Sequence, residues 1–214
     1  MKTKTEMIEA ENYHVMQKQD IDAFADCLAH AFEGYSLFEY FSNKKYNVKR
    51  MKFFWKVVLK TSGKRIIGIS DCAEPKALAF FYPENDTQVN ILSYIRAGGW
   101  QIPFLFGFGK MRQMLNFEAF AQKIKEKYVS EHCGYLYGFV VLPEYRHHGL
   151  ATQVLSPMLT YFDRIGKDCY LETLEEKNVA LYEHYGFSLM ESTTVPGTDL
   201  KVYAMLRKSR EMDS

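Results

Sequence analysis

The sequence predicts one α/β domain with a mixed central sheet and helices on both faces. A chain of 214 residues suits one sizeable domain and is short for two with separate cores. Hydrophobic residues make up 47% of it, which is enough for a full core and excludes a disordered chain. Helix-like and strand-like segments alternate along the sequence, and such interleaving is typical of a sheet covered on both sides.

The charge balance and the hydropathy pattern exclude several classes of protein. Lys and Arg number 27 against 26 Asp and Glu, so no basic excess favours nucleic acid as a partner. No apolar run reaches the roughly 20 residues that span a bilayer, and residues 1–12 lack the apolar stretch of a signal peptide. We therefore expect a cytoplasmic protein, a monomer or a homodimer, with no membrane partner.

The cysteines indicate neither disulfides nor a metal site. They are widely scattered and form no Cys-x-x-Cys pair; their positions are Cys27, Cys72, Cys133 and Cys169. This spacing fits reduced thiols in the core better than a disulfide framework or a zinc site. No metal is therefore expected.

Two amphipathic helices are predicted in the first third of the chain. Apolar residues recur at three-to-four spacing over 20–32, and Asp20 is placed to cap the first turn. The same spacing over 51–59 predicts a second helix, which Ser62 and Gly63 close.

The spacing of apolar residues changes in the middle of the chain. Segments 65–70 and 77–82 are short, apolar and β-branched or aromatic, so they predict adjacent strands in a hairpin. Glycines and a proline interrupt 85–116, which predicts helix and loop without a clear period, and 117–128 restores a helical stripe. Four aromatic residues of this region predict core or a pocket wall: Trp100, Phe104, Phe106 and Phe108.

A strand, a turn and a helix follow one another over 135–166. Residues 135–142 are a continuous apolar run of strand length, and Pro143 stops it. A strongly periodic helix begins at Leu150, and Gly166 occupies the position of a left-handed C-terminal cap. After it, the pattern predicts strands at 169–173, 188–194 and 201–207, with a short helix at 179–185 between the first two.

The turn before Leu150 has the features of a phosphate site. It reads Arg-His-His-Gly-Leu-Ala over 146–151. The start of a helix exposes unpaired N–H groups and the positive end of the helix dipole, and the small Gly149 and Ala151 let a phosphate approach them. The spacing Arg-x-x-Gly-x-Ala is neither a Walker loop nor the Gly-x-Gly-x-x-Gly fingerprint, so a different phosphate cradle is predicted.

These segments resemble the GNAT superfamily of N-acetyltransferases, whose acetyl-CoA motif is a strand followed by Gln/Arg-x-x-Gly-x-Gly/Ala at a helix start. Residues 146–151 fill that motif. The downstream Leu-Glu-Thr, Asn-Val, Leu-Tyr-Glu and Gly-Phe of 171–187 resemble the branch that contains puromycin N-acetyltransferase. The likeness is strong over 135–208 and weaker around 31–35. One departure is Leu174-Glu175-Glu176, which adds negative charge near the predicted phosphate site.

The resemblance implies a GNAT acyl-CoA N-acyltransferase fold and transfer of an acetyl group from acetyl-CoA to an amine of a small molecule. The amine would attack the thioester directly in a ternary complex, with no metal. The resemblance implies one GNAT domain over 1–214, in which 135–208 bind acetyl-CoA and 1–134 supply acceptor-side helices and the first strands.

The resemblance also implies roles for particular residues. Tyr182 is the expected general acid that protonates the CoA thiolate, and the general base remains open between Tyr35 and Glu172. The expected cofactor-binding residues are Val140, Val141 and Leu142 along the pantetheine arm, Arg146, His147, His148, Gly149, Leu150, Ala151 and Thr152 around the pyrophosphate, and Asn178 with Tyr182 beside the arm.

Two alternatives stay open on the sequence. One is a non-catalytic module that binds or senses acyl-CoA, and the other is a transferase for a longer acyl-CoA. The acceptor would be chosen by the first two helices and by 85–116, whose many Phe and Tyr residues favour a partly apolar or aromatic amine.

Overall fold

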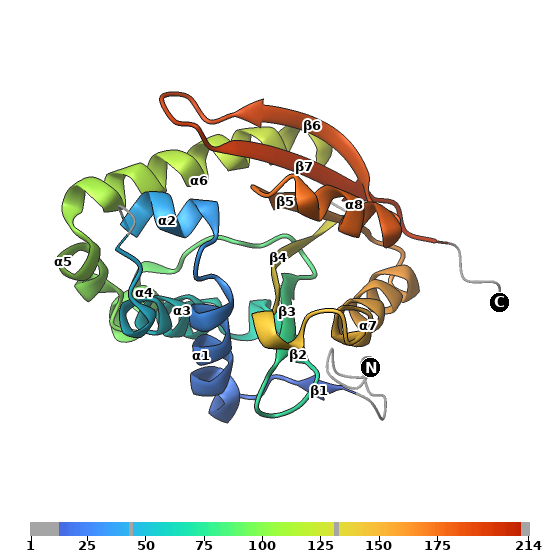
Figure 1. The fold of residues 1–214 in the computed structure, drawn as a ribbon, viewed down its shortest axis with the longest axis horizontal. Helices are drawn as coiled ribbons and strands as arrows, with labels where there is room; N and C mark the ends of the chain where they lie inside the picture. Colours follow the sequence, from blue (N-terminus) through green and yellow to red (C-terminus); the bar gives the residue numbers. More distant parts are fainter. Residues whose placement is uncertain (1–12, 43–44, 131–132, 211–214) are drawn as a thin grey trace.

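The computed structural model describes residues 13–42, 45–130 and 133–210, and within them the strands form one mixed sheet. The strands are β1 (His14–Val15), β2 (Ile67–Ser70), β3 (Ala77–Tyr82), β4 (Cys133–Val141), β5 (Asp168–Thr173), β6 (Ser188–Thr194) and β7 (Lys201–Arg207). Their order is β1-β2-β3-β4-β5-β7-β6, in which β4 and β5 run parallel and every other neighbouring pair is antiparallel. The predicted mixed α/β class is confirmed (Figure 1).

Helices cover both faces of this sheet (Figure 1). They are α1 (Ile21–Ala31), α2 (Ser36–Ser42), α3 (Val48–Ser62), α4 (Ile91–Arg96), α5 (Ile102–Phe106), α6 (Phe108–Tyr128), α7 (Leu150–Arg164) and α8 (Lys177–His184). On one face α7 packs with α8, and on the other α1 packs with α3, beside α2 and α6. The core side chains include Val154, Leu155, Met158 and Phe162 of α7, Phe24, Leu28, Met51 and Trp55 of α1 and α3, and Phe41 and Phe117 of α2 and α6.

The predicted cap at Asp20 is wrong. Asp20 has helical backbone angles, and its side chain makes no hydrogen bond to the first turn of α1. Its carboxylate instead accepts from the Gln17 N–H at 2.7 Å and lies 2.7 Å from His14 Nε2, so it closes the short turn before the helix. At α3 the cap is Asn47, whose side chain accepts from the Arg50 N–H at 3.0 Å.

Several short elements were not predicted. The two residues of β1 pair with Ile69 and Ser70 but are too few to show a period. Helix α2 has seven residues, which hold barely two turns of apolar spacing. Segment 85–116, predicted as helix and loop without bounds, contains α4, α5 and the first part of α6, so α6 is longer than the predicted 117–128.

The thiols follow the prediction in part. Cys27, Cys133 and Cys169 are buried and all four cysteines are free, but Cys72 is partly exposed, because it lies in the turn between β2 and β3 and not in the core. Among the residues described, no group of three His, Cys, Asp or Glu side chains could hold a metal ion. No helix in the same residues is long and apolar enough to cross a membrane. The prediction drawn from residues 1–12 lies outside the described residues.

The sheet diverges at its centre. β4 and β5 are paired only from Cys133↔Asp168 to Tyr135↔Tyr170. Beyond these pairs β4 continues along β3 and β5 continues along β7. An extra residue, Tyr137, bulges from β4, because Phe80 pairs with Gly138 and Phe81 pairs with Leu136. We refer to this region, where the two parallel strands separate, as the β4–β5 divergence.

Gly138 is required beside this bulge. A Cβ atom at this position would lie 2.3 Å from the Phe80 ring, which is completely buried. The absence of a side chain therefore lets Phe80 pack against β4 and keeps the bulge in place.

A buried ion pair joins β7 to α7. The two terminal nitrogens of Arg207 on β7 donate to the two oxygens of Asp163 on α7, each at 2.7 Å. The side chains are 4% and 12% exposed. Arg207 Nε also donates to the Tyr185 carbonyl oxygen at 3.2 Å, just after α8. One guanidinium thus fixes α7, α8 and β7 relative to one another.

We expect Arg207→Lys to lower the free energy of unfolding by about 1–2 kcal/mol, because an ammonium keeps the charge but loses the paired geometry and the Tyr185 contact. Urea unfolding measures this change. Lys208→Ala is the control: Lys208 is 76% exposed in its pair with Asp168, and its loss should cost less than about 1 kcal/mol. Equal free energies of unfolding for the two variants would show that the paired geometry of Arg207 does not stabilise the fold.

Candidate functional site

The predicted phosphate cradle is an open turn at the start of α7. His147 and Gly149 both have left-handed backbone angles, with φ of 66° and 78°. Residues 146–149 are exposed, and a Cβ atom added at Gly149 would meet nothing within 4 Å. The first N–H groups of a helix have no partner within it, and left-handed residues at such a turn aim backbone N–H groups into a concave anion site. The turn can therefore receive a phosphate.

Arg146 supplies a positive charge near this turn. Arg146 is exposed and its Nε donates to the Val141 carbonyl oxygen at 3.4 Å, so it stays beside the end of β4. Glu175 accepts from the N–H of Ser36 at 3.1 Å and from its hydroxyl at 2.5 Å. Of the two acidic residues that the sequence suggested beside the phosphate site, Glu175 is thus tied to the start of α2, whereas Glu176 is exposed.

The end of β4 borders the same space. Val140 and Val141 pair with Leu78 and Ala77 of β3 on one edge. Beyond Tyr135 the described residues provide no strand partner for the opposite edge. An amide-bearing chain can add to such an edge as an extra strand would.

Polar side chains contact the end of β5, beside the β4–β5 divergence. Asn178 Nδ2 donates to Thr173 Oγ1 at 3.1 Å, and the Leu174 N–H donates to the Tyr35 hydroxyl at 3.0 Å. The predicted residues Asn178 and Tyr35 therefore both lie next to the turn that connects β5 to α8.

Glu172 on β5 supplies a carboxylate next to the β4–β5 divergence. One of its oxygens accepts from the Tyr135 hydroxyl at 2.7 Å. Burial raises the pKa of Glu172 to about 7, although the Tyr135 hydrogen bond and the positive charge of Lys125 oppose the rise. Lys125 is itself 4% exposed, and its Nζ lies 4.5 Å from the centre of the Tyr135 ring. Glu172 thus changes charge close to neutral pH.

Tyr35 and Tyr182 lie close enough to influence each other. Burial raises the pKa of Tyr35, and the charges of Glu175 and Glu172 raise it further. Tyr182 on α8 is 6% exposed, and its ring packs edge-on against Phe187 with 5.8 Å between centroids. Burial, and then Tyr35, raise the pKa of Tyr182, so its phenol stays protonated at neutral pH.

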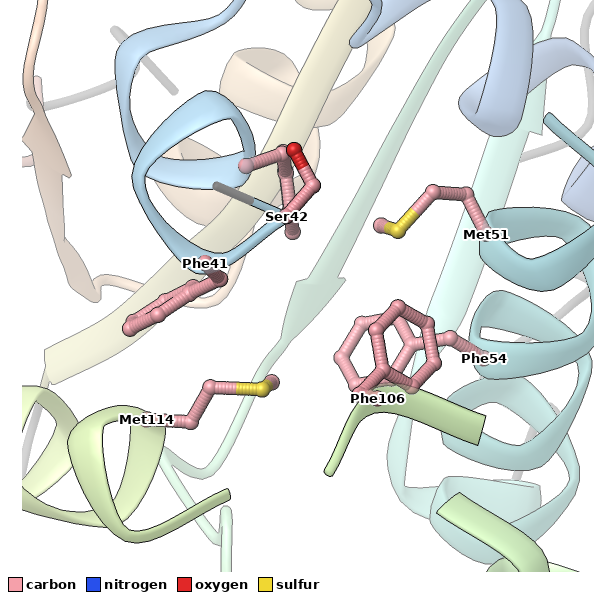
Figure 2. A pocket seen from close by; sticks show the side chains of 7 residues that line it. Phe41, Ser42, Met51, Phe54, Phe106 and Met114 are labelled. Atoms are coloured by element: carbon pink, nitrogen blue, oxygen red, sulfur yellow. The ribbon is translucent and has the colours of Figure 1, made fainter. Parts of the chain in front are cut away.

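An apolar pocket lies on the acceptor side, between α2, α3, α5 and α6 (Figure 2). It is lined by Phe38, Phe41, Ser42, Met51, Phe54, Phe106 and Met114 and encloses space for about one water molecule. In Figure 2 these side chains converge from α2 and α6 on one side and α3 and α5 on the other. Sequence reasoning missed it because α2 was not predicted and the prediction of helix and loop over 85–116 gave no bounds for α5.

The predicted role of the aromatic cluster is corrected. Phe106 lines the pocket, but Trp100, Phe104 and Phe108 are 58%, 73% and 68% exposed, so they belong neither to the core nor to this wall. They lie in a single turn of 3₁₀ helix, on the five-residue α5 and in the first turn of α6, and their rings contact one another edge-on at the surface.

Lys125 and Glu118 were also missed. They occupy one face of α6, next to the apolar stripe of Phe117, Ala121 and Ile124. A lysine four residues after Ala121, on the apolar face, was the available signal. The part of the chain that includes Glu118 showed no family motif.

Comparison with known proteins finds a family match over part of the chain. Residues 105–187 match the model of the acetyltransferase (GNAT) family. The match covers less than half of the chain. The matched part includes α6, β4, the turn before α7, α7 itself, β5 and α8.

Solved structures share the fold over nearly the whole chain. A histone acetyltransferase HPA2 and related acetyltransferase from Corynebacterium glutamicum ATCC 13032 is 14% identical, with a TM-score of 0.62 over 95% of this chain and 99% of that one. YncA of Salmonella typhimurium, solved with its cofactor acetyl-CoA, is 11% identical, with a TM-score of 0.54 over 96% and 98%. The PaiA N-acetyltransferase of Thermoplasma acidophilum, solved with coenzyme A, is 12% identical, with a TM-score of 0.51 over 92% and 99%. No curated protein matches the sequence.

Proposed function

We propose that this protein transfers an acetyl group from acetyl-CoA to an amine of a small molecule, by direct attack of the amine on the thioester. One observation carries the proposal: the open left-handed turn before α7 lies at the end of β4, beside the β4–β5 divergence. An anion site next to a free strand edge suits a ligand that has a diphosphate followed by an amide-bearing arm. The GNAT match over 105–187 and the coenzyme in two structures of this fold support it.

On the cofactor side, the residues present suit coenzyme A. Residues 146–152 would hold the diphosphate through the N–H groups of 147–151 and the charge of Arg146. The free edge of β4 at 140–142 would pair with the pantetheine arm, with Asn178 beside it. In this arrangement 135–208 bind the cofactor, and the helices and first strands of 1–134 receive the acceptor. The cofactor-binding part and the acceptor-binding part would thus belong to one structural domain over 1–214.

The acceptor side must remove a proton from the amine. An alkylammonium has a pKa of about 10.4, so its deprotonation at pH 7 costs roughly 4.6 kcal/mol. Glu172 suits the base, because its pKa of about 7 makes it an acceptor at neutral pH. Tyr35 suits the wall of the site, because burial moves its pKa away from neutral. Tyr182 suits the acid, since a protonated phenol can donate to the departing thiolate.

The cofactor site is tested by titration calorimetry with CoA and by release of free thiol from acetyl-CoA in an amine library. We expect Gly149→Val to weaken CoA binding by tenfold or more, because a β-branched residue strains the left-handed turn and fills the cradle. Gly166→Val is the matched control: Gly166 has φ of 63° and equally open surroundings at the opposite end of α7. Equal loss of affinity in both variants, or no CoA uptake by the unaltered protein, would refute the site.

The same assay separates the alternatives. CoA binding without thiol release on any amine would indicate a non-catalytic module, and turnover restricted to longer thioesters would indicate another acyl donor. Placement in the puromycin N-acetyltransferase branch is part of the proposal and is supported by the Leu-Glu-Thr, Leu-Tyr-Glu and Gly-Phe motifs of 171–187.

A further inference from the structure

Three side chains from three elements form a series of contacts at the β4–β5 divergence: Lys125 of α6, Tyr135 of β4 and Glu172 of β5. We propose that Tyr135 and Lys125 are positioning residues for the base Glu172. The Tyr135 hydroxyl fixes the carboxylate at the divergence, and the buried Lys125 ammonium favours its ionised form. This inference rests on the proposed function, because it concerns the base of the same reaction.

Tyr135 contacts Glu172 at the point where the two strands separate. It is the last residue of β4 that pairs with β5, opposite Tyr170. Its hydroxyl donates at 2.7 Å to Oε2 of Glu172, two residues further along β5. Within the described residues the other oxygen, Oε1, accepts no hydrogen bond, so it can take a proton from the amine. The hydroxyl thus fixes one oxygen of the base and leaves the other for the reaction.

Neighbouring side chains hold the ring of Tyr135 in place. It packs edge-on against Tyr137 with 5.6 Å between centroids, and its centroid lies 6.0 Å from that of the Tyr170 ring. Lys125 Nζ lies 4.5 Å from its centre. A ring packed in this way keeps its hydroxyl directed at Glu172, because the ring has little room to turn.

Lys125 brings a positive charge into this buried region. Its side chain is 4% exposed, although lysine is rarely buried without a reason. A cation over the face of a tyrosine ring is attracted by the π electrons, more strongly where water is excluded. Burial lowers the pKa of Lys125, and the charge of Glu172 is the largest influence that opposes this fall. The ammonium and the carboxylate therefore favour each other's charged forms.

Other titratable groups surround Glu172, but they act on it less. Burial raises its pKa; the Tyr135 hydroxyl and then Lys125 oppose the rise most strongly, and the charge of Glu118 adds to it. On the other side, β7 pairs the uncharged Ala204 with Glu172. The titratable groups from the elements packed around it are Tyr135, Tyr137, Tyr170, Lys125, Glu118 and Tyr35. Lys125 is the cation among them, so removing its charge or the Tyr135 hydroxyl should have the largest effects.

Tyr135→Phe tests the hydrogen bond, because it removes the hydroxyl and keeps the ring. Without this donor to its ionised form, Glu172 should titrate about one pH unit higher. The midpoint of the rise of kcat/KM with pH should move up equally, so that kcat/KM falls about tenfold at pH 6 and less than about threefold at pH 9. A residue that only maintained the fold would lower kcat/KM by the same factor at every pH.

The titration of Glu172 is also measured without substrate. The ¹³C chemical shift of its side-chain carboxyl, followed from pH 5 to 9 in protein labelled at glutamate, reports the protonation state directly. Glu172→Gln identifies the signal, because only that signal disappears. The midpoint of this titration should move with the midpoint of kcat/KM in every variant.

Lys125→Met removes the charge and keeps a side chain of similar length. The loss of the cation should raise the titration midpoint of Glu172 by about half a pH unit, and Lys125→Arg, which keeps a positive charge, should restore it. Circular dichroism checks that each variant folds. Tyr135→Phe, which loses a single oxygen atom, decides the outcome if a Lys125 variant does not fold.

The chain offers matched controls at its surface. Lys127 Nζ and the Tyr128 hydroxyl donate to one oxygen of Glu191 at 2.8 and 2.9 Å, which repeats the combination of lysine, tyrosine and glutamate between α6 and β6. Lys127→Met and Tyr128→Phe make the same chemical changes away from the divergence. Both should leave the midpoint of Glu172 and the profile of kcat/KM unchanged.

The possible outcomes separate this inference from the proposed function. If acetyl-CoA does not bind, or if Glu172→Gln keeps the plateau of kcat/KM above pH 7, the proposed function or its base fails, whatever Tyr135→Phe does. If Glu172→Gln removes the plateau but Tyr135→Phe moves the two midpoints no further than Tyr128→Phe does, the positioning inference alone is overturned.

Discussion

Tyr182→Phe is expected to lower kcat for acetyl transfer by about 10²–10⁴-fold, the range that a positioned general acid contributes. The change removes one hydroxyl and keeps the ring that packs against Phe187. CoA affinity should therefore change less than about threefold. Because burial holds the pKa of Tyr182 well above its ordinary value, the phenol is protonated at every pH up to 10, and the variant should keep the shape of the pH profile. Steady-state kinetics from pH 6 to 9 measure both quantities.

A matched control exists on α7. Tyr161 is 3% exposed, belongs to the same apolar cluster as Tyr182, and has a pKa that burial raises in the same direction. Tyr161→Phe should retain kcat. A Tyr182→Phe variant as active as Tyr161→Phe would show that Tyr182 is a core residue and would remove it from the mechanism.

Glu172→Gln is expected to abolish the pH dependence that the carboxylate imposes. Below a pKa of about 7, Glu172 is protonated and cannot accept a proton; above it, the carboxylate is ionised. In the unaltered enzyme kcat/KM should therefore rise about tenfold per pH unit below 7 and level off above it. In the variant kcat/KM at pH 8 should fall by about 10²–10³-fold and should rise continuously with pH, following the free amine.

The melting temperature of the Glu172→Gln variant distinguishes this loss of kcat/KM from misfolding. A pKa raised on folding means that the native state prefers protonated Glu172, so the ionised form destabilises the fold above pH 7. The neutral amide that Glu172→Gln introduces lacks this penalty, and the variant should melt at the same or a higher temperature at pH 8. Glu126→Gln, at an exposed position on α6, is the control for the same chemical change. A variant that keeps the plateau above pH 7 would exclude Glu172 as the base.

The sequence predicted those parts of the fold whose apolar pattern is local. The run over 135–142 and the stripe from Leu150 gave β4 and α7, because both elements bury one long apolar surface. The turn between them was predictable from Gly149, since a left-handed angle at a helix start favours glycine.

Other parts could not be predicted because they depend on distant contacts. Helix α2 is held by Glu175, which lies 139 residues away from Ser36. The apolar pocket exists only where α2, α3, α5 and α6 meet, and the raised pKa of Glu172 follows from burial that no local pattern reveals. The bulge at Tyr137 likewise arises from pairing with β3. Individual candidate residues could therefore be predicted from the sequence, whereas the pocket and the contacts that they form together could not.

We propose that the turn before α7 binds the diphosphate of coenzyme A through its backbone N–H groups. Amide chemical shifts of ¹⁵N-labelled protein, followed during a titration with CoA, measure this contact. We expect the amide signals of 146–152 to shift most and Gly149→Val to suppress these shifts. Binding that leaves the signals of 146–152 in place, while others move, would contradict it.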